Sequence, residues 1–190
     1  MNPENIVRAW LDEARSTEPG EADAFQLATA DASGRPSVRT VLLRWIRDDG
    51  WTFFTDYRSR KSQQMTENPS VAGVFCWKTL NRQVHVEGSV TRATEADSDE
   101  YFAQRPRGSQ IGAWASHQSA PLTQRADLEG RVAAATTRFA DVTVPRPATW
   151  GGWRIVPNRI ELWEGRDNRL HDRTLFLRTA EGWASTSLFP

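Results

Sequence analysis

Residues 24–55 read AFQLATADASGRPSVRTVLLRWIRDDGWTFFT, and this stretch decides the fold. Three apolar and β-branched runs predict strands, at 24–30, 38–45 and 51–55. The polar run 31–36 contains a glycine and a proline and predicts the first turn. The sequence Arg47-Asp48-Asp49-Gly50 predicts a tight hairpin between the second and third strands. Short strands joined by short turns indicate an antiparallel meander.

Beyond this stretch the meander continues to residue 93. Ser59 is placed to cap a short helix that ends by Asn68-Pro69, and strands are predicted at 71–77 and 82–93. The C-terminal part returns to strands, predicted at 152–156, 159–163, 170–178 and 183–188.

Helices are predicted before and after the meander, at about 1–17, through residue 104, and at about 122–140. Asn2 followed by Pro3 suits an N-cap and a first helical position. Thr94 and Asp97 form a capping pair for the second helix, which Pro106 stops.

These elements predict a mainly β protein with helices, of the α+β class, built on an antiparallel barrel. We expect one domain, 1–190, with an N-terminal helix (about 1–17), a barrel meander (24–93), a helical insertion (94–140) and C-terminal strands (150–190). Alternating βαβ units and a glycine-rich phosphate loop after a strand are missing from the pattern, which argues against a doubly wound dinucleotide fold.

Composition excludes several classes of protein. The single cysteine, Cys76, excludes an internal disulfide, and the three histidines have no zinc-like spacing. We therefore expect a reducing cytoplasm and no structural metal. A signal sequence and a long apolar span are not found, so neither secretion nor a membrane partner is expected. The net charge of zero argues against nucleic-acid binding.

Ser59-Arg60-Lys61 stands at a predicted helix start. Cations there face the positive end of the helix dipole, which is unfavourable unless an anion is bound. The segment is therefore either a phosphate seat or an exposed basic turn.

Two further groups of polar side chains could bind an anionic ligand. Tyr101 and Arg105 lie four residues apart on one helical face, with Ser109 just beyond Pro106. These suit a phosphate, although Tyr101 could instead be a core anchor. Arg169, His171 and Arg173 alternate along a predicted strand and so would share one face. They mark either a solvated strand end or a site for a flat anionic ligand.

Cys76 lies in an apolar strand, and no serine has the frame of a nucleophile elbow. If the protein is an enzyme, a cofactor must therefore supply the chemistry.

At this point the sequence closely resembles the pyridoxamine 5′-phosphate oxidase family, from about Trp10 to Pro190 and in family order. The matching segments in the first half are Arg39-Thr40-Val41-Leu42-Leu43-Arg44, Phe54-Thr55, Ser59-Arg60-Lys61, Arg82-Gln83-Val84 and Tyr101-Phe102 with Arg105-Pro106-Arg107. Those in the second half are Ser109-Gln110-Ile111-Gly112-Ala113-Trp114, Gln118-Ser119, Trp150-Gly151-Gly152, Ile160-Glu161-Leu162-Trp163 and Arg169-Leu170-His171-Asp172-Arg173.

The resemblance implies a split β-barrel homodimer with FMN bound between its subunits. The residues implied to bind FMN are Arg39, Thr40, Val41, Leu42, Leu43, Arg44, Phe54, Thr55, Arg60, Lys61, Gln83, Gln118, Ser119, Trp163 and Arg173. Of these, Arg39, Arg60 and Lys61 would hold the flavin phosphate with Gln118 and Ser119, and Gln83, Trp163 and Arg173 would contact the isoalloxazine.

The resemblance also implies the substrate and the reaction. Arg44, Tyr101, Arg105 and Ser109 would hold the phosphate of a B6 vitamer, and Arg169 and His171 would clamp its pyridine ring as the catalytic pair. The implied reaction is hydride transfer from pyridoxamine or pyridoxine 5′-phosphate to the flavin, followed by reoxidation with O₂ to hydrogen peroxide.

The sequence departs from the family pattern at several points. Arg44 stands where lysine is usual, and Leu162 and Glu164 replace an aromatic and a neutral residue beside Trp163. The usual extension ahead of Asn2 is largely missing. Strict alternation also puts Arg39 and Arg44 on opposite strand faces, which predicts a bulge between them or two different sites.

Two alternatives remain from the sequence. One is an FMN-dependent oxidase of another small aromatic substrate, as in the phenazine-forming relatives. The other is a non-catalytic carrier of flavin or pyridoxal phosphate. The set Arg44, Tyr101, Arg105 and Ser109 favours a phosphorylated substrate.

Overall fold

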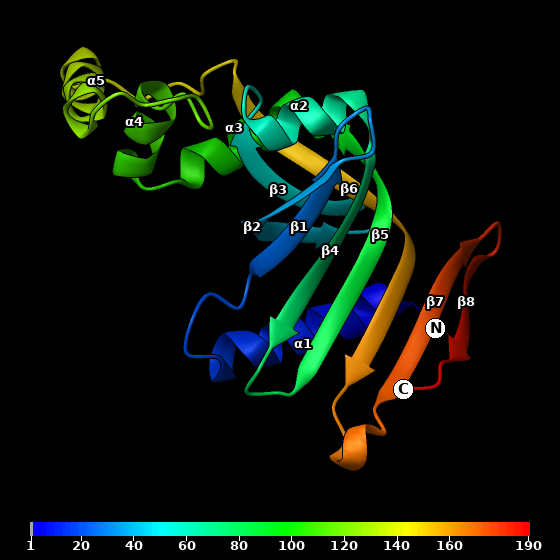
Figure 1. Cartoon of the computed structure of the whole chain (residues 1–190). Helices are drawn as coiled ribbons and strands as arrows, with labels where there is room; N and C mark the ends of the chain where they lie inside the picture. Colours follow the sequence, from blue (N-terminus) through cyan, green and yellow to red (C-terminus); the bar gives the residue numbers. More distant parts are fainter. Residues whose placement is uncertain (1) are drawn as a thin grey trace.

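The computed structural model describes residues 2–190 and shows a barrel with a helical arm (Figure 1). The helices are α1 (Pro3–Thr17), α2 (Arg60–Glu67), α3 (Glu95–Gln104), α4 (Arg107–Ala115), α5 (Arg125–Arg138) and the 3-10 turn η1 (Asp167–Arg169). The strands are β1 (Ala24–Ala30), β2 (Pro36–Arg47), β3 (Gly50–Asp56), β4 (Ser70–Trp77), β5 (Arg82–Arg92), β6 (Trp150–Glu164), β7 (Asp172–Thr179) and β8 (Gly182–Ser187).

The strands form one antiparallel sheet that closes on itself. Their order is β3-β2-β1-β4-β5-β6-β7-β8, and β3 also pairs with β6. This last pairing sets Trp51 opposite Ile155 and closes β1–β6 into a six-stranded barrel. Strands β7 and β8 continue the sheet outside the barrel (Figure 1). The predicted antiparallel split barrel is confirmed.

Large apolar side chains fill the barrel. Phe25, Phe53 and Phe75 are fully buried, and each contributes on the order of 1.5–3 kcal/mol through removal from water. Helix α1 covers one end of the barrel and buries Val7 and Leu11 there. Its start follows the predicted signal, since the Asn2 side chain accepts a hydrogen bond from the backbone N–H of residue 4 at 2.9 Å.

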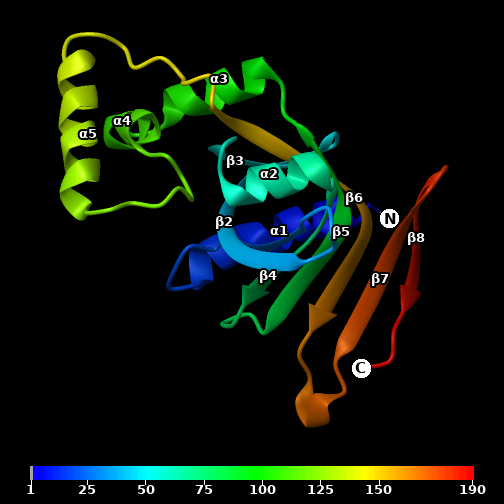
Figure 2. The ribbon, with the colours of Figure 1, turned by 45° about the horizontal axis from the view of Figure 1, so that its top comes forward.

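Helices α3, α4 and α5 form an arm at the other end of the barrel (Figure 2). The arm has a small core of its own that includes Phe102, Ile111 and Phe139, and Trp150 at the start of β6 joins it. The predicted cap of α3 is confirmed, because the Thr94 hydroxyl accepts from the backbone N–H of Asp97 at 3.0 Å.

Three features of the barrel and the arm differ from the prediction. The two strands predicted between 152 and 163 are one strand, β6. Its pairing with β5 continues past Pro157, which lies opposite Gly88, because the register shifts between Glu87 and Gly88. Helix α4 was not predicted, since Pro106 ends α3 but also stands at the N-cap of α4. Helix α5 is shorter than the predicted range 122–140 and begins at Arg125.

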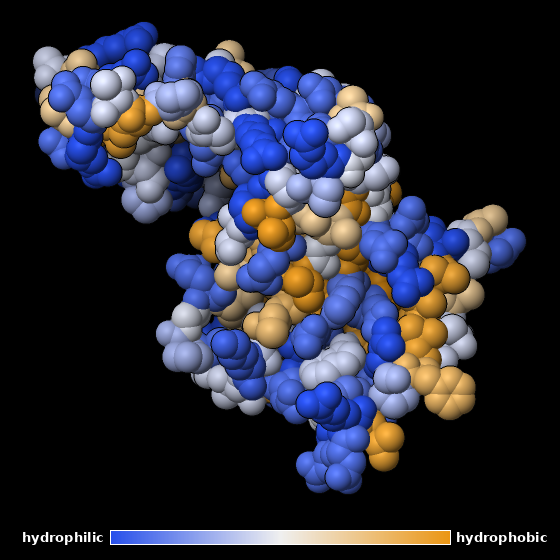
Figure 3. All heavy atoms as spheres, in the orientation of Figure 1, coloured by the Kyte–Doolittle hydropathy of each residue, from blue (hydrophilic) through white to orange (hydrophobic). Residues whose placement is uncertain are grey.

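The extension beyond the barrel exposes apolar side chains. Figure 3 shows apolar atoms gathered on the side of the molecule where Figure 1 places β7 and β8. Leu177 on β7 is 44% exposed, and Phe189 after β8 is 93% exposed. An apolar surface of this kind is typical of an interface with another chain.

Candidate functional site

A cavity of about 690 Å³ lies between the barrel and the helical arm. Most of the site residues predicted between Arg39 and Gln118 line it, namely Thr40, Val41, Leu42, Arg44, Phe54, Thr55, Lys61, Tyr101, Arg105, Ser109 and Gln118. The volume suits a cofactor-sized ligand. Strands β2 and β3 supply one wall, α2 supplies Lys61, and α3 with α4 supply the opposite wall.

Lys61 is the buried cation at one end of this cavity. Its side chain is 7% exposed, and its Nζ donates to Oε1 of Gln118 at 2.8 Å and to Oγ1 of Thr55 at 3.0 Å. Among residues 2–190 no carboxylate accepts a hydrogen bond from it. Burial, with the nearby charge of Arg39, lowers the pKa of Lys61 to about 8. A desolvated cation among neutral acceptors suits a bound anion.

Among the described residues, no side chain caps the backbone N–H groups at the start of α2. Ser59 is the N-cap residue, as predicted, but its hydroxyl makes no capping bond. Instead it donates to Ser62 Oγ at 3.2 Å and accepts from Lys61 Nζ at 3.2 Å. The predicted capping bond is therefore wrong, and the first N–H groups of α2, which make up the positive end of its dipole, have no side-chain cap beside Lys61 in the part of the chain that the structure describes.

A second cationic group lies on the arm side of the cavity. The Arg105 guanidinium stacks 4.6 Å from the Trp150 ring centroid, and its Nη1 is buried without a hydrogen-bond partner in the described chain. Burial lowers the pKa of Arg105, with a smaller contribution from the charge of Arg44. An orphaned guanidinium nitrogen beside another arginine is the donor set that a phosphate requires.

Aromatic rings fix the geometry of this second group. The Phe54 ring stacks on Tyr101 with centroids 4.2 Å apart, and Trp150 lies parallel to Phe54 at 5.7 Å. Phe54 comes from β3 and Tyr101 from α3, so the stack joins the barrel to the arm. Tyr101 packs on these neighbours, as expected of a core anchor, and it also lines the cavity; its binding of phosphate stays a prediction.

A bulge in β2, one of the two alternatives predicted, is present at Arg44. The register of β2 against β3 shifts between Leu43 and Trp45, so Arg44 is the extra residue and lines the cavity. Arg39 is not among the residues that line the cavity of this single chain, and its contact with the flavin phosphate stays a prediction. Its guanidinium donates to the carbonyl of Leu27 at 3.1 Å, to the Thr29 hydroxyl at 2.7 Å and to Oε1 of Gln64 on α2 at 3.3 Å, and its charge is near enough to lower the pKa of Lys61.

Other predicted phosphate ligands also lie outside the cavity lining. Arg60 is exposed on the first turn of α2, and Ser119 is exposed with a positive φ of 71° just after Gln118. Leu43 is 1% exposed and belongs to the barrel core, because it points inward from β2. Of the residues predicted to hold the flavin phosphate, Lys61 and Gln118 are joined by a hydrogen bond in this single chain, and Thr55, predicted to line the same pocket, bonds to both.

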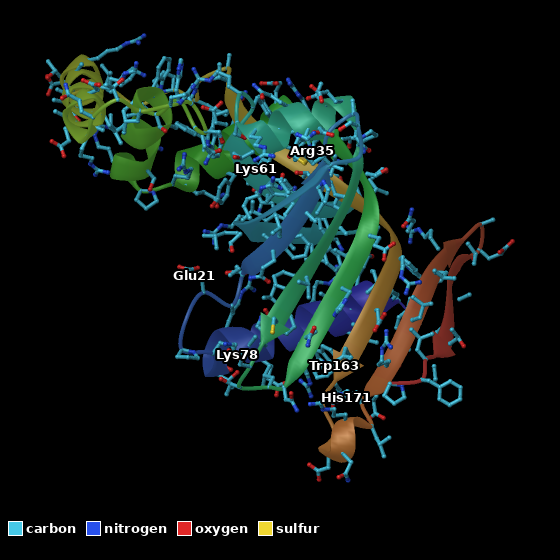
Figure 4. All side chains as sticks on the ribbon, viewed as in Figure 1. Glu21, Arg35, Lys61, Lys78, Trp163 and His171 are labelled. Carbon is cyan, nitrogen blue, oxygen red and sulfur yellow. The ribbon has the colours of Figure 1, made fainter. Side chains whose placement is uncertain are left out.

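A second cluster of predicted residues lies at the opposite end of the barrel. Figure 4 shows Lys61 near the arm, whereas Trp163 and His171 lie at the far end of β6. The register places Gln83 opposite Trp163 and Trp163 opposite Arg173, in one row across β5, β6 and β7. The Trp163 and His171 rings are 4.5 Å apart. One chain alone therefore does not bring this cluster to the cavity.

The predicted strand alternation of Arg169, His171 and Arg173 is wrong. Strand β7 begins at Asp172, and Arg169 ends the 3-10 turn with a positive φ of 62°. Asn168 beside it also has positive φ, which makes this a strained turn. His171 is oriented by its own loop, where its Nδ1 accepts from the backbone N–H of Arg166 at 3.1 Å. Neutral His171 therefore carries its proton on Nε2.

Comparison with known families decides the identity of this arrangement. The family model described as "Pyridoxamine 5'-phosphate oxidase" matches residues 11–139, and the model described as "Pyridoxine 5'-phosphate oxidase C-terminal dimerisation region" matches 150–190. The chain belongs to the pyridoxamine 5′-phosphate oxidase family. Members of this family are FMN-dependent oxidoreductases.

Relatives of known name support membership of the pyridoxamine 5′-phosphate oxidase family. A pyridoxine/pyridoxamine 5'-phosphate oxidase of Sphingopyxis alaskensis is 51% identical over 189 residues, which cover 100% of this chain and 88% of the relative. The protein of that name from Rubrobacter xylanophilus is 51% identical over 181 residues, covering 95% and 83%. PhzG from Burkholderia lata, solved with tetrahydrophenazine-1-carboxylic acid, has a TM-score of 0.93 at 30% identity, covering 100% of this chain and 93% of PhzG.

Several residues near these family positions were not predicted. Trp150 and Gln104 also line the cavity, and Glu161 is buried beside Arg173. The sequence offered one signal, since Trp150 and Glu161 lie inside segments that carry the family resemblance. In residues 2–190 we found no set of three or more side chains arranged to hold a metal ion, and no helix with the length and apolarity to cross a membrane.

Proposed function

We propose that this protein oxidises pyridoxamine 5′-phosphate or pyridoxine 5′-phosphate to pyridoxal 5′-phosphate, with FMN as cofactor and O₂ as acceptor. The observation that carries the proposal is the presence of two separate anion seats in one cavity. Lys61 lies at one seat and Arg105 with Arg44 at the other. Two seats suit a phosphorylated cofactor and a phosphorylated substrate bound side by side.

The flavin phosphate is assigned to the seat at the start of α2. Lys61 supplies a positive charge that neutral acceptors hold in place, and the uncapped N–H groups of α2 add donors. Gln118 and Thr55 orient Lys61 through hydrogen bonds of 2.8 and 3.0 Å. Because these groups are fixed before the ligand arrives, little ordering is required on binding.

The substrate phosphate is assigned to Arg44, Tyr101, Arg105 and Ser109 on the arm side. The unpaired Nη1 of Arg105 would gain a charge-assisted hydrogen bond there. Arg44 replaces the usual lysine, and its guanidinium can offer two parallel donors to one phosphate. This remote binding energy serves to hold the pyridine ring in a reactive position.

A second copy of the chain completes the site. The cluster around Trp163 lies too far from the cavity of its own chain, but Trp163, Arg169, His171 and Arg173 all fall in the segment matched by the dimerisation region. We infer a homodimer in which each cavity receives this cluster from the other subunit. The exposed apolar residues Leu177 and Phe189 on the same segment favour such contact.

In this dimer the protein aligns the substrate with the flavin and handles protons. Bound FMN supplies hydride acceptance from the carbon that bears the amine or alcohol and return of the electrons to O₂ as hydrogen peroxide. Arg169 and His171 would hold the pyridine ring in line for transfer. His171 presents Nε2–H to a polar substituent of the ring, because Nδ1 is occupied by the Arg166 backbone. For the amine, water and O₂ are consumed and ammonia is released with the aldehyde.

The proposal is tested by an absorbance spectrum and a peroxide assay on the purified protein. We expect a flavin spectrum and peroxide release with pyridoxamine 5′-phosphate. The matched control is unphosphorylated pyridoxamine, which should have a much higher KM because it leaves the seat at Arg105 unused. Equal kcat/KM for the two compounds would contradict the substrate assignment.

A second candidate is oxidation of a phenazine-type substrate, which the high structural similarity to PhzG favours. Such a substrate carries a carboxylate and no phosphate, so it would not need all four of the residues at the second seat. The same peroxide assay with a reduced phenazine carboxylate separates the two. Faster turnover of that compound than of pyridoxamine 5′-phosphate would establish the second candidate.

A further inference from the structure

Glu161 is a buried carboxylate on the sheet face that carries Trp163 and Arg173. Its side chain is 5% exposed, and its Oε1 accepts a hydrogen bond from Nε of Arg173 at 2.7 Å. Burial of a carboxylate is unfavourable unless a close cationic partner compensates for lost hydration. The bond to Arg173 is short and charge-assisted, and it raises the pKa of Arg173.

The strand register explains how this contact arises. Arg173 on β7 lies directly opposite Trp163 on β6, and Glu161 precedes Trp163 by two residues on the same face. Arg173 therefore reaches diagonally back along β6 to meet Glu161. Its guanidinium is turned by this bond and does not extend freely from the end of the strand.

The C-terminal segment holds a second edge of the same guanidinium. Arg173 Nη1 donates to the carbonyl of Phe189 at 3.0 Å, and the backbone N–H of Leu188 donates to the carbonyl of Arg173 at 2.9 Å. Because Nε and Nη1 each donate a hydrogen bond within the chain, Nη2 is the nitrogen left to donate to a ligand. An arginine ordered in this way loses little further freedom when a ligand binds.

A neighbouring ion pair shows that Glu161 serves Arg173 in particular. Arg159 Nη2 is 3.6 Å from Glu161, but Arg159 has its own closer carboxylate in Glu87 at 3.2 Å. Glu87 is 57% exposed on the same face, one row along the sheet. It is therefore a natural control, since it bears the same charge without touching Arg173.

We propose that Glu161 is a positioning residue that aims Arg173 at the polar edge of the flavin in the other subunit's cavity. This inference rests on the proposed function, in which the cluster around Trp163 completes that cavity. Glu161 itself does not touch the flavin. Its role is to fix the direction of the one guanidinium in the row formed with Gln83 and Trp163.

The test is a titration of apoprotein with FMN, in which quenching of the flavin fluorescence measures binding. Glu161→Gln keeps the shape of the side chain but removes the charge, and we expect the FMN dissociation constant to rise about tenfold. Arg173→Gln should raise it by at least as much. In the Arg173→Gln background, Glu161→Gln should add nothing, because the group through which it acts is gone.

Controls separate this inference from general effects and from the proposed function. Glu87→Gln should bind FMN as the wild type does, and Glu161→Asp should recover part of the affinity lost in Glu161→Gln. The inference is overturned if Glu161→Gln binds FMN like the wild type, if Glu87→Gln weakens binding equally, or if the Glu161→Gln effect persists without Arg173. Failure of the wild-type apoprotein to bind FMN would instead overturn the proposed function.

Discussion

Nζ of Lys61 lies 2.8 Å from Oε1 of Gln118, although 57 residues separate the two in the chain. Lys61 belongs to the first turn of α2 on the barrel, and Gln118 follows α4 in the arm. The contact therefore ties the arm to the barrel at the point where we place the flavin phosphate. Because the buried lysine has neutral acceptors as partners, an anion should bind there strongly.

Lys61→Met should remove most of the flavin phosphate binding. One charge-assisted contact of about 1.5–3 kcal/mol is lost, so the FMN dissociation constant should rise at least about tenfold. The melting temperature of the apoprotein should not fall, because the substitution removes a desolvated charge. Flavin titration and thermal unfolding measure the two effects. Lys78→Met, at the other lysine of the chain and on an exposed hairpin, is the matched control.

The lowered pKa of Lys61 predicts a pH dependence with a definite sign. The value is about 8 in the folded protein against an ordinary 10.5, so between these limits the unfolded chain holds more protons. The free energy of unfolding of the apoprotein should therefore gain a favourable contribution as pH rises from about 8 toward 10.5. FMN affinity should fall over the same range, because the phosphate requires the charged lysine.

Urea unfolding and FMN titration at about pH 7 and about pH 9 measure this dependence. Other groups titrate in this range, so the informative quantity is the difference between the wild type and Lys61→Met. If the two proteins change equally with pH, Lys61 is not the group responsible.

Arg105→Lys should damage substrate binding and leave the flavin in place. Lysine keeps the charge but loses the planar fork and the stacking on Trp150, so KM for pyridoxamine 5′-phosphate should rise about tenfold. The flavin content after purification should equal that of the wild type. Arg125→Ala, at a side chain 77% exposed on the arm, serves as control. Loss of flavin in Arg105→Lys would show that the two anion seats are assigned the wrong way round.

Mixing two impaired variants, at an FMN concentration too low to fill the Lys61→Met cavity, tests whether each site uses both subunits. In Lys61→Met the cavity is damaged, and in Arg169→Ala the cluster at the other end of the barrel is damaged. A mixed dimer of these chains has one intact site, made from the cavity of one subunit and the cluster of the other. After denaturation and refolding together, activity should recover to about one quarter of the wild-type value, since half of the dimers are mixed. No recovery would place the whole site within one chain.

The barrel could be predicted from sequence because its strands are local and well marked. The run 24–55 carries alternating apolar residues between strong turn signals, and the structure places β1 at the predicted residues. Two of the errors in the predicted elements occur at prolines. Pro157 lies within β6 opposite a register shift, and Pro106 separates two helices where only the first was expected.

Only part of the candidate site could be predicted from sequence, because the direction of a side chain depends on the element that carries it. Residues such as Lys61 and Tyr101 lie in the cavity because helix starts and helix faces fix their direction. For Arg39, the sequence could not supply the contacts with Leu27 and Gln64, which depend on the pairing of β2 with β1 and on the packing of α2. The pairing of Glu161 with Arg173 depends on the register between β6 and β7, which sequence spacing cannot supply.

The pairing of β3 with β6 has a kinetic consequence. Strands β1–β5 all lie within residues 24–92, whereas Trp51 and Ile155 are about one hundred residues apart, so closure should come late in folding. The cavity is incomplete until then, because Phe54 and Trp150 meet across this pairing. Refolding rates should therefore be independent of FMN concentration, while unfolding slows as FMN is added. Stopped-flow tryptophan fluorescence measures both rates, and refolding accelerated by FMN would show that the cavity forms before the barrel closes.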